Sequence, residues 1–141
     1  MSQQTNQSRR VGDMRRKRRA GTLSLMALET SKFIQGLFEF SGAGLKRAVP
    51  LTPPVKYTVP FDKRSQLIYL RAGNPQGELV YLVLTRDGKP MRYFPIGAKD
   101  AVHVPLAIVD DIEPEVTLEL LLGAPEGLAG SVLIDMGLVE V

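Results

Sequence analysis

Residues 79–96 read LVYLVLTRDGKPMRYFPI, and this stretch decides the expected fold class. Its two arms, 79–86 and 90–96, are rich in the β-branched and aromatic side chains that favour strands. Asp87-Gly88 lies between the arms, and an Asp-Gly pair in that position is a strong signal for a hairpin turn. The run LVYLVL is apolar at consecutive positions, which is typical of a strand covered on both faces. The stretch therefore predicts an antiparallel hairpin with one strand deep in the protein.

Five further stretches have the same character, and turn signals rich in glycine, proline and acidic residues separate them. They are VKYTVPF (55–61), SQLIYLRA (65–72), AVHVPLAIV (101–109), VTLELLL (116–122) and GSVLIDMGLVEV (130–141). No helical period interleaves them, which disfavours a parallel α/β sheet. The sequence thus predicts a mainly all-β fold, a small antiparallel seven-stranded immunoglobulin-like β-sandwich over residues 55–141. We expect this domain to fold on its own and without metal.

Residues 22–40, TLSLMALETSKFIQGLFEF, show apolar side chains at intervals of three and four, which predicts an amphipathic helix. Its first half also alternates as a strand would, and Gly36 lowers helix propensity by roughly 1 kcal/mol relative to alanine. The helix and a following hinge are expected to fill residues 22–47, and the prolines of residues 48–54 predict an extended linker. The helix face is expected to bind a partner through Met26, Phe33, Ile34, Leu37 and Phe40.

The segment RRVGDMRRKRR, residues 9–19, carries seven cations and one acid, whereas residues 56–141 carry eight cations and twelve acids. The net charge of +3 therefore combines a basic arm with an acidic body. Like charges with no apolar surface to bury favour disorder, so we expect residues 1–21 to be a disordered arginine-rich arm. Guanidinium groups pair with phosphate in a planar, bidentate manner, which favours polyanion binding. The predicted polyanion-binding residues are Arg9, Arg10, Arg15, Arg16, Lys17, Arg18 and Arg19.

The composition restricts the possible chemistry. The chain has no cysteine, which excludes disulfides and thiolate metal sites and favours an intracellular, cytoplasmic location. It has no run of about eighteen apolar residues, so no membrane-spanning helix is expected. His103 is the single histidine, one imidazole does not make a usual zinc site, and no nucleophile elbow accompanies it. We expect His103 to be a sheet-face residue, and we expect no catalytic residue, metal or cofactor.

Acidic residues cluster before the stretch 116–122, at Asp110, Asp111, Glu113 and Glu115. Carboxylates suit calcium, but the spacing lacks the glycine and the terminal bidentate glutamate of an EF-hand loop. A solvated turn is the favoured interpretation, and a weak cation site or a dock for the basic arm stay open. The segment SGAGLKRA, residues 41–48, lacks the phosphate-loop pattern and is expected to be a hinge.

Two classes of function fit these features. The first is a non-enzymatic structural or assembly protein, in which the β-sandwich makes subunit contacts with itself or other proteins. Its arm would bind a polyanion, with nucleic acid phosphate as the leading candidate, without sequence specificity. The alternative is an accessory or docking subunit of a membrane-peripheral or multi-subunit enzyme complex. The arm and helix would anchor that subunit, and an anionic membrane surface is one candidate partner.

Overall fold

The computed structural model describes residues 30–105 and 111–141, and those residues form strands and turns with no helix. They belong to two units, of which the first, Met1–Thr30 with Val141, is described only at Thr30 and Val141. The second unit, Ser31–Glu140, holds the sheet and its core. The all-β prediction is therefore confirmed for the described part of the chain.

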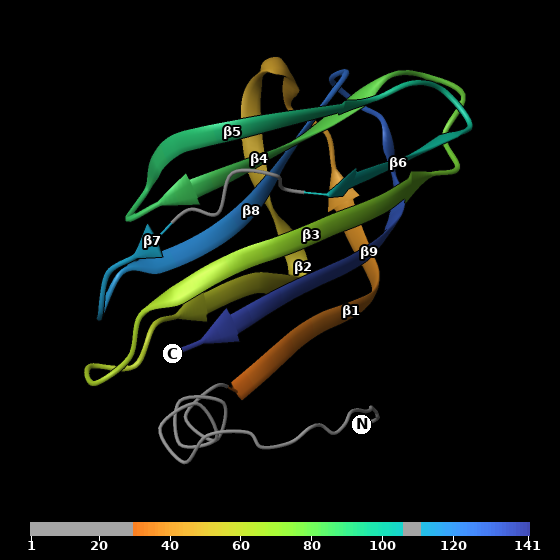
Figure 1. The fold of residues 1–141 in the computed structure, drawn as a ribbon. Coiled ribbons are helices and arrows are strands. Elements are labelled where there is room, and N and C mark those ends of the chain that lie inside the picture. The colour runs from red at the N-terminus through yellow and green to blue at the C-terminus, as the bar shows by residue number, and fades with distance from the viewer. Residues whose placement is uncertain (1–29, 106–110) are drawn as a thin grey trace. The chain divides into compact units, whose positions relative to one another are not determined.

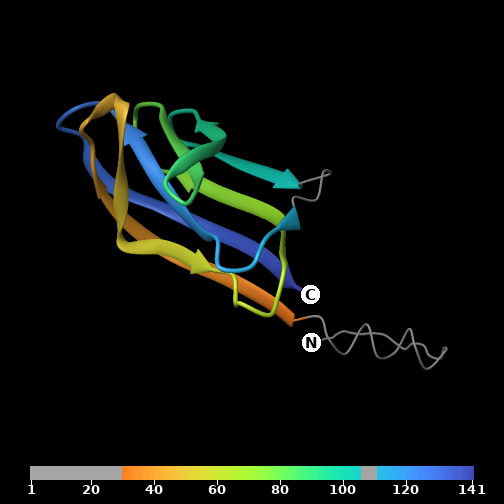
Figure 2. The same ribbon diagram turned by 90° about the vertical axis from the view of Figure 1, so that its left-hand side faces the viewer.

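The described residues form nine strands in one nearly closed antiparallel sheet (Figure 1). The strands are β1 (Thr30–Ser41), β2 (Gly44–Thr58), β3 (Ser65–Asn74), β4 (Val80–Arg86), β5 (Lys89–Ile96), β6 (Asp100–Pro105), β7 (Asp111–Ile112), β8 (Thr117–Ala124) and β9 (Ala129–Glu140). Their order in the sheet is β5-β4-β8-β2-β1-β9-β3-β6, and the short β7 pairs with β3. One half of the sheet, β5 to β2, and the other half, β1 to β6, enclose the core (Figure 2).

The hairpin predicted from residues 79–96 is present as β4 and β5. Asp87 and Gly88 have φ angles of 49° and 83°, and two-residue hairpin turns of the common type need positive φ at both central positions. Leu82, Val83 and Leu84 are consecutive and are all buried, as the apolar run in the sequence predicted. The reason is that β4 lies inside the sheet, between β5 and β8.

The predicted helix is wrong where the structure describes it, because residues 30–41 form β1. Phe38 and Phe40 point into the core, whereas Phe33 and Leu37 are exposed. A segment this short has only a few apolar residues, and their spacing matches the helical period and the strand period equally well. Pairing with β9 and β2 decides in favour of the strand. Residues 22–29 of the expected helix lie outside the described residues.

The proline-rich segment, residues 48–54, lies within β2 and is no linker. Val49 and Pro50 pair with β8, the register then shifts, and pairing resumes at Val55. Prolines lack the N–H that a ladder needs, which explains why the interruption falls on the prolines. Leu51, inside this segment, is 1% exposed and belongs to the core. The segment is therefore an irregular part of a central strand.

The seven-stranded immunoglobulin-like arrangement is not confirmed, because the described residues form nine strands in one sheet. Six of the seven expected stretches each correspond to one strand, and 55–61 holds only the end of β2. The additional strands are β1, β7 and the first part of β2, which covers residues 44–47 of the expected hinge. β1 and β2 lie in the middle of the strand order, between β8 and β9. They contribute Phe38, Phe40 and Leu51 to the core. Independent folding of residues 55–141 was expected from the sequence and is untested, but the position of these two strands argues against it, because their removal would open the sheet between β8 and β9.

Candidate functional site

The candidate site is the outer face of the half-sheet β1-β9-β3-β6, meaning the side chains that point away from the core. Alternation along β9 sets this direction, because Ile134 and Met136 are buried while Leu133 and Asp135 lie on the opposite face. The β3–β9 register then places Arg71 opposite Asp135 and Gly73 opposite Leu133. The outer face, as the term is used below, comprises Phe33, Gln35, Leu37, Tyr69, Arg71, Gly73, Ala101, His103, Leu133 and Asp135.

Asp135 is the centre of a hydrogen-bond network that joins three strands. Gln35 of β1 donates from Nε2 to Asp135 Oδ1 over 3.0 Å. Tyr69 of β3 donates its hydroxyl to the same oxygen over 2.8 Å, and Arg71 donates from Nη2 to Oδ2. Burial alone would raise the pKa of Asp135, but hydrogen bonds from Arg71, Tyr69 and Gln35 outweigh burial and hold that pKa below its usual value. The carboxylate is thus ionised at neutral pH, and three donors occupy it.

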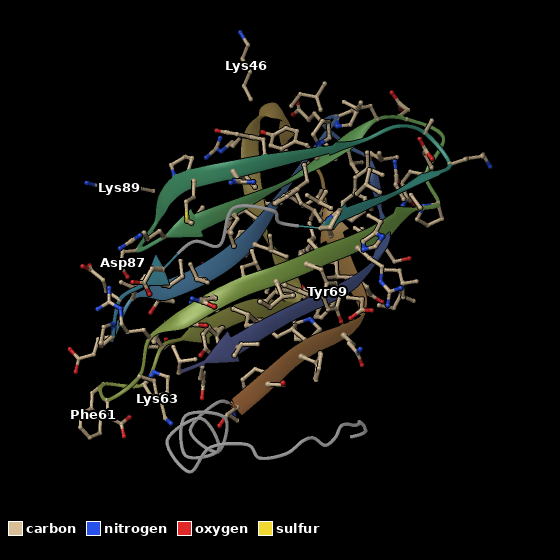
Figure 3. The ribbon with its side chains drawn as sticks, viewed as in Figure 1. Lys46, Phe61, Lys63, Tyr69, Asp87 and Lys89 are labelled. Atoms are coloured by element: carbon tan, nitrogen blue, oxygen red, sulfur yellow. The ribbon has the colours of Figure 1, made fainter. Side chains whose placement is uncertain are left out.

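The ring of Tyr69 packs over a glycine of the neighbouring strand, where there is no side chain to displace it. It lies where β3 passes β9 (Figure 3), and a Cβ added to Gly137 would fall 2.3 Å from Tyr69 Cε2. The Arg71 guanidinium carbon lies 5.5 Å from the centroid of the Tyr69 ring, which is cation–π distance. Burial, and then the hydrogen bond to Asp135, raise the pKa of Tyr69. These contacts position Tyr69 and Arg71 against Asp135.

Two adjoining hollows lie beside this network, with volumes of about 410 and about 700 Å³. Gly73, Ala101 and Leu133 line both of them. The first hollow adds Arg71, Ala72, Val102, His103 and Asp135, and the second adds Leu37, Asn74, Pro75, Lys99 and Asp100. The outer face therefore has a shallow groove with a floor of small residues, apolar walls and a charged end.

His103 lies on the outer face of β6, and its Cα pairs across the ladder with that of Arg71. This is the sheet-face position that the sequence predicted. Within residues 30–105 and 111–141, no three histidine, aspartate or glutamate side chains are grouped as a metal site would need.

The acidic cluster is partly engaged with nearby arginines. Asp111 accepts from Arg64 Nε at 3.0 Å, and Glu113 lies 3.3 Å from Arg86 Nη2. Glu115 has a φ of 68° in the turn, where its N–H donates to the carbonyl of Val59. Asp110 lies outside the described residues. Two of the four acids thus form local ion pairs, and these agree with a solvated turn.

The residues that were expected to bind a partner do not share one face of the structure. Phe33 and Leu37 are 60% and 61% exposed on the outer face. Ile34 and Phe40 instead pack with the core. Met26 and all the cations expected to bind a polyanion, Arg9, Arg10, Arg15, Arg16, Lys17, Arg18 and Arg19, lie outside the described residues.

Sequence reasoning missed the groove and the Asp135 network. The polar residues Tyr69 and Arg71 alternate with buried ones in β3, and this alternation is a readable sign of an outer face. The partners across the ladder were not readable, because the register of β3 with β6 and β9 is set by contacts far apart in sequence.

The chain shows no significant match to a protein-family model or to a curated protein. Among solved structures it is similar to an exo-β-1,3-galactanase from Phanerochaete chrysosporium, solved with galactose, at 12% identity and a TM-score of 0.38. The alignment covers 80% of this chain and 29% of that one, so the chain spans less than a third of the galactanase. Similarity at this level carries no functional conclusion. In the part of the chain that the structure describes, no helix is long and apolar enough to cross a membrane.

Proposed function

We propose that the chain is a non-enzymatic assembly protein with a β-sandwich body that makes subunit contacts and a basic arm that binds a polyanion. The observation that carries the proposal is the exposure of three large apolar side chains on one face. Phe33, Leu37 and Leu133 are 60%, 61% and 56% exposed, and all belong to the neighbouring strands β1 and β9. Single exposed apolar residues are ordinary, but several on one sheet face commonly indicate a protein contact.

The contact is tested by placing a charge at its centre. Leu37→Asp and Phe33→Asp should abolish assembly, because a charge transferred into an interface without a partner is costly. Phe61→Asp is the matched control, since Phe61 is 77% exposed in the turn between β2 and β3 (Figure 3). Tagged chains purified from the native host and measured by sedimentation velocity should keep their complex with the control and lose it with the outer-face variants. Equal loss or equal retention in all three variants would reject the outer face as the contact.

The arm is the second part of the proposal, and the seven cations in residues 9–19 support it. Binding driven by phosphate should weaken steeply with salt, with a slope of log K against log salt of up to roughly −6 for seven contacts. Alanine at Arg15, Arg16, Lys17, Arg18 and Arg19 should flatten that slope on a fluorescent DNA duplex. Binding that ignores salt, or survives the substitution, would reject the phosphate mechanism. Flotation with anionic vesicles but no nucleic acid binding would instead favour a membrane-peripheral accessory subunit.

A further inference from the structure

Gly73 is the next-to-last residue of β3, where it pairs with β6 on one side and β9 on the other, although nothing in the fold requires a glycine there. Its φ is outside the left-handed region, and an added Cβ would meet only Leu133 Cβ at 3.9 Å, an ordinary contact distance. The irregularity in the β3–β9 pairing lies elsewhere, between Leu67 and Tyr69. Glycine in a strand interior weakens the strand and often marks a place where a ligand or another backbone approaches closely. Gly137 is different, because the ring of Tyr69 occupies the space of its missing side chain.

Gly73 is the floor of the groove. Across the two ladders it pairs with Leu133 on one side and with Ala101 on the other, and all three residues line both hollows. The exposed side chains of Leu133 and Leu37 border the second hollow. The first hollow alone, at about 410 Å³, is within the range of roughly 300–1,000 Å³ that is usual for small-molecule sites. A side chain at position 73 would fill this space, so the glycine keeps the groove open.

The charged end of the groove has spare donors but little spare acceptor capacity. Asp135 already accepts hydrogen bonds from Gln35, Tyr69 and Arg71. A guanidinium has five N–H groups, and the hydrogen bond from Arg71 to Asp135 uses one of them. The Arg71 side chain remains 57% exposed and lines the first hollow together with His103. A ligand group that accepts hydrogen bonds therefore complements this end, and a carboxylate would share the exposed Arg71 guanidinium with Asp135.

We propose that the groove binds a small organic acid. Its apolar group would lie on Gly73 and Ala101 between the leucine walls, and its carboxylate would pair with Arg71, with His103 beside it. Residues two apart on a strand are roughly 6.6–6.8 Å apart, so the carboxylate should be about that distance from the centre of the apolar group. This site goes beyond the assembly role and does not depend on it, but Leu37 and Leu133 belong to both surfaces, so a bound subunit and the acid would compete for this face.

The test uses 3-phenylpropionate, whose ring and carboxylate have about this separation, with 3-phenylpropionamide and 3-phenylpropylamine as matched neutral and cationic probes. Ligand-observed saturation-transfer NMR on the full chain measures binding, with the affinity of the acid expected at a Kd of about 1 mM for a fragment of this size. We expect the acid to bind about tenfold more tightly than the amide, because a charge-assisted hydrogen bond is stronger than a neutral one. The amine should bind most weakly.

Variants separate the groove from the arm, which could also attract acids. Gly73→Val should remove binding of all three probes while leaving the fold intact, and Gly77→Val is its matched control, since Gly77 has open space around it and lines neither hollow. Arg71→Gln should reduce binding of the acid to that of the amide. Alanine at the five cations of residues 15–19 should leave binding unchanged. Equal binding of acid and amide, wild-type binding by Gly73→Val, or loss of binding in the arm variant would each overturn the proposal.

Discussion

Asn74 gives the sharpest test of what holds the end of β3 to the chain segments beside it. Its side chain is 2% exposed at the end of β3. Nδ2 donates to the carbonyls of Glu78, Ile96 and Gly97 at 2.9, 3.3 and 3.0 Å. Oδ1 accepts from the backbone N–H of Gln76 at 3.0 Å. One amide thus joins the end of β3, the turn after it and the segment between β5 and β6.

Asn74→Ala removes every one of these bonds but adds no charge. The carbonyl of Ile96 is buried, and the other partners are half-buried and can reach water. With about 1 kcal/mol for each net hydrogen bond and somewhat more for the buried carbonyl, we expect a loss of about 2–4 kcal/mol in the free energy of unfolding. Small domains have only about 5–15 kcal/mol in total, so the variant should still fold.

Asn74→Asp keeps the shape and the bond from Gln76 but turns a donor into a charged acceptor that faces three carbonyl oxygens. We expect a loss of about 4 kcal/mol or more at pH 7, since an uncompensated buried charge is more costly than a missing hydrogen bond. The site should raise the pKa of the introduced carboxyl above its unfolded value. The destabilisation is then complete above the folded pKa and shrinks as the pH falls towards the unfolded pKa.

Urea unfolding followed by far-UV circular dichroism, at pH 7 and again near pH 4, measures these differences, and the chain has no tryptophan to follow instead. The expected order of stability at pH 7 is wild type, Asn74→Ala, Asn74→Asp, with the gap between the two variants narrowing near pH 4. An aspartate variant as stable as wild type at pH 7, or a gap that widens on acidification, would refute the role assigned to this amide.

Three further predictions concern packing, a partly buried hydrogen-bonded pair and the folding unit. Gly137→Ala should destabilise the protein by about 1–3 kcal/mol in urea unfolding, because its Cβ would fall 2.3 Å from Tyr69. Tyr57 donates to Glu140 over 2.5 Å, and burial, then that bond, raise the pKa of Tyr57 to about 12. The wild type should therefore lose stability between about pH 10, the unfolded value, and pH 12, whereas Tyr57→Phe should lose less over that window but be less stable at pH 7. A chain truncated to residues 55–141 should fail to give a cooperative melt, and one that begins at β1 should give it, because β1 and β2 lie within the sheet order.

The sequence was sufficient where local chemistry decides the structure. Asp87 and Gly88 tolerate the positive φ that their turn needs, and the strands beside them are apolar enough to be recognised without any partner. Over residues 30–41 it was insufficient, since Phe33, Leu37 and Phe40 follow a helical spacing and the strand is decided by pairing with β9. The prolines of residues 48–54 indicate extended backbone in a linker and in an irregular strand alike, so their sequence could not distinguish the two.

The candidate site was harder to predict because it depends on which strands pair with each other. Exposure of Phe33 and Leu37 follows from alternation once β1 is known to be a strand. Gly73 lies opposite Ala101 and Leu133 only because of the registers of β3 with β6 and with β9. A shift of one residue in either register would move the side chains of the shifted strand to the other face of the sheet. No local pattern carries that information.

The placing of β1 and β2 between β8 and β9 has a consequence for synthesis on the ribosome. The earliest strands have no neighbours in the sheet order until residues 117–140 have been made, apart from each other. Closure of such long loops is slow, and it leaves apolar strands exposed in the meantime. The nascent chain should therefore acquire its tertiary structure late and in one step. Until then β1 and β2 are the strands that lack their remaining neighbours longest, and a chaperone would bind them first.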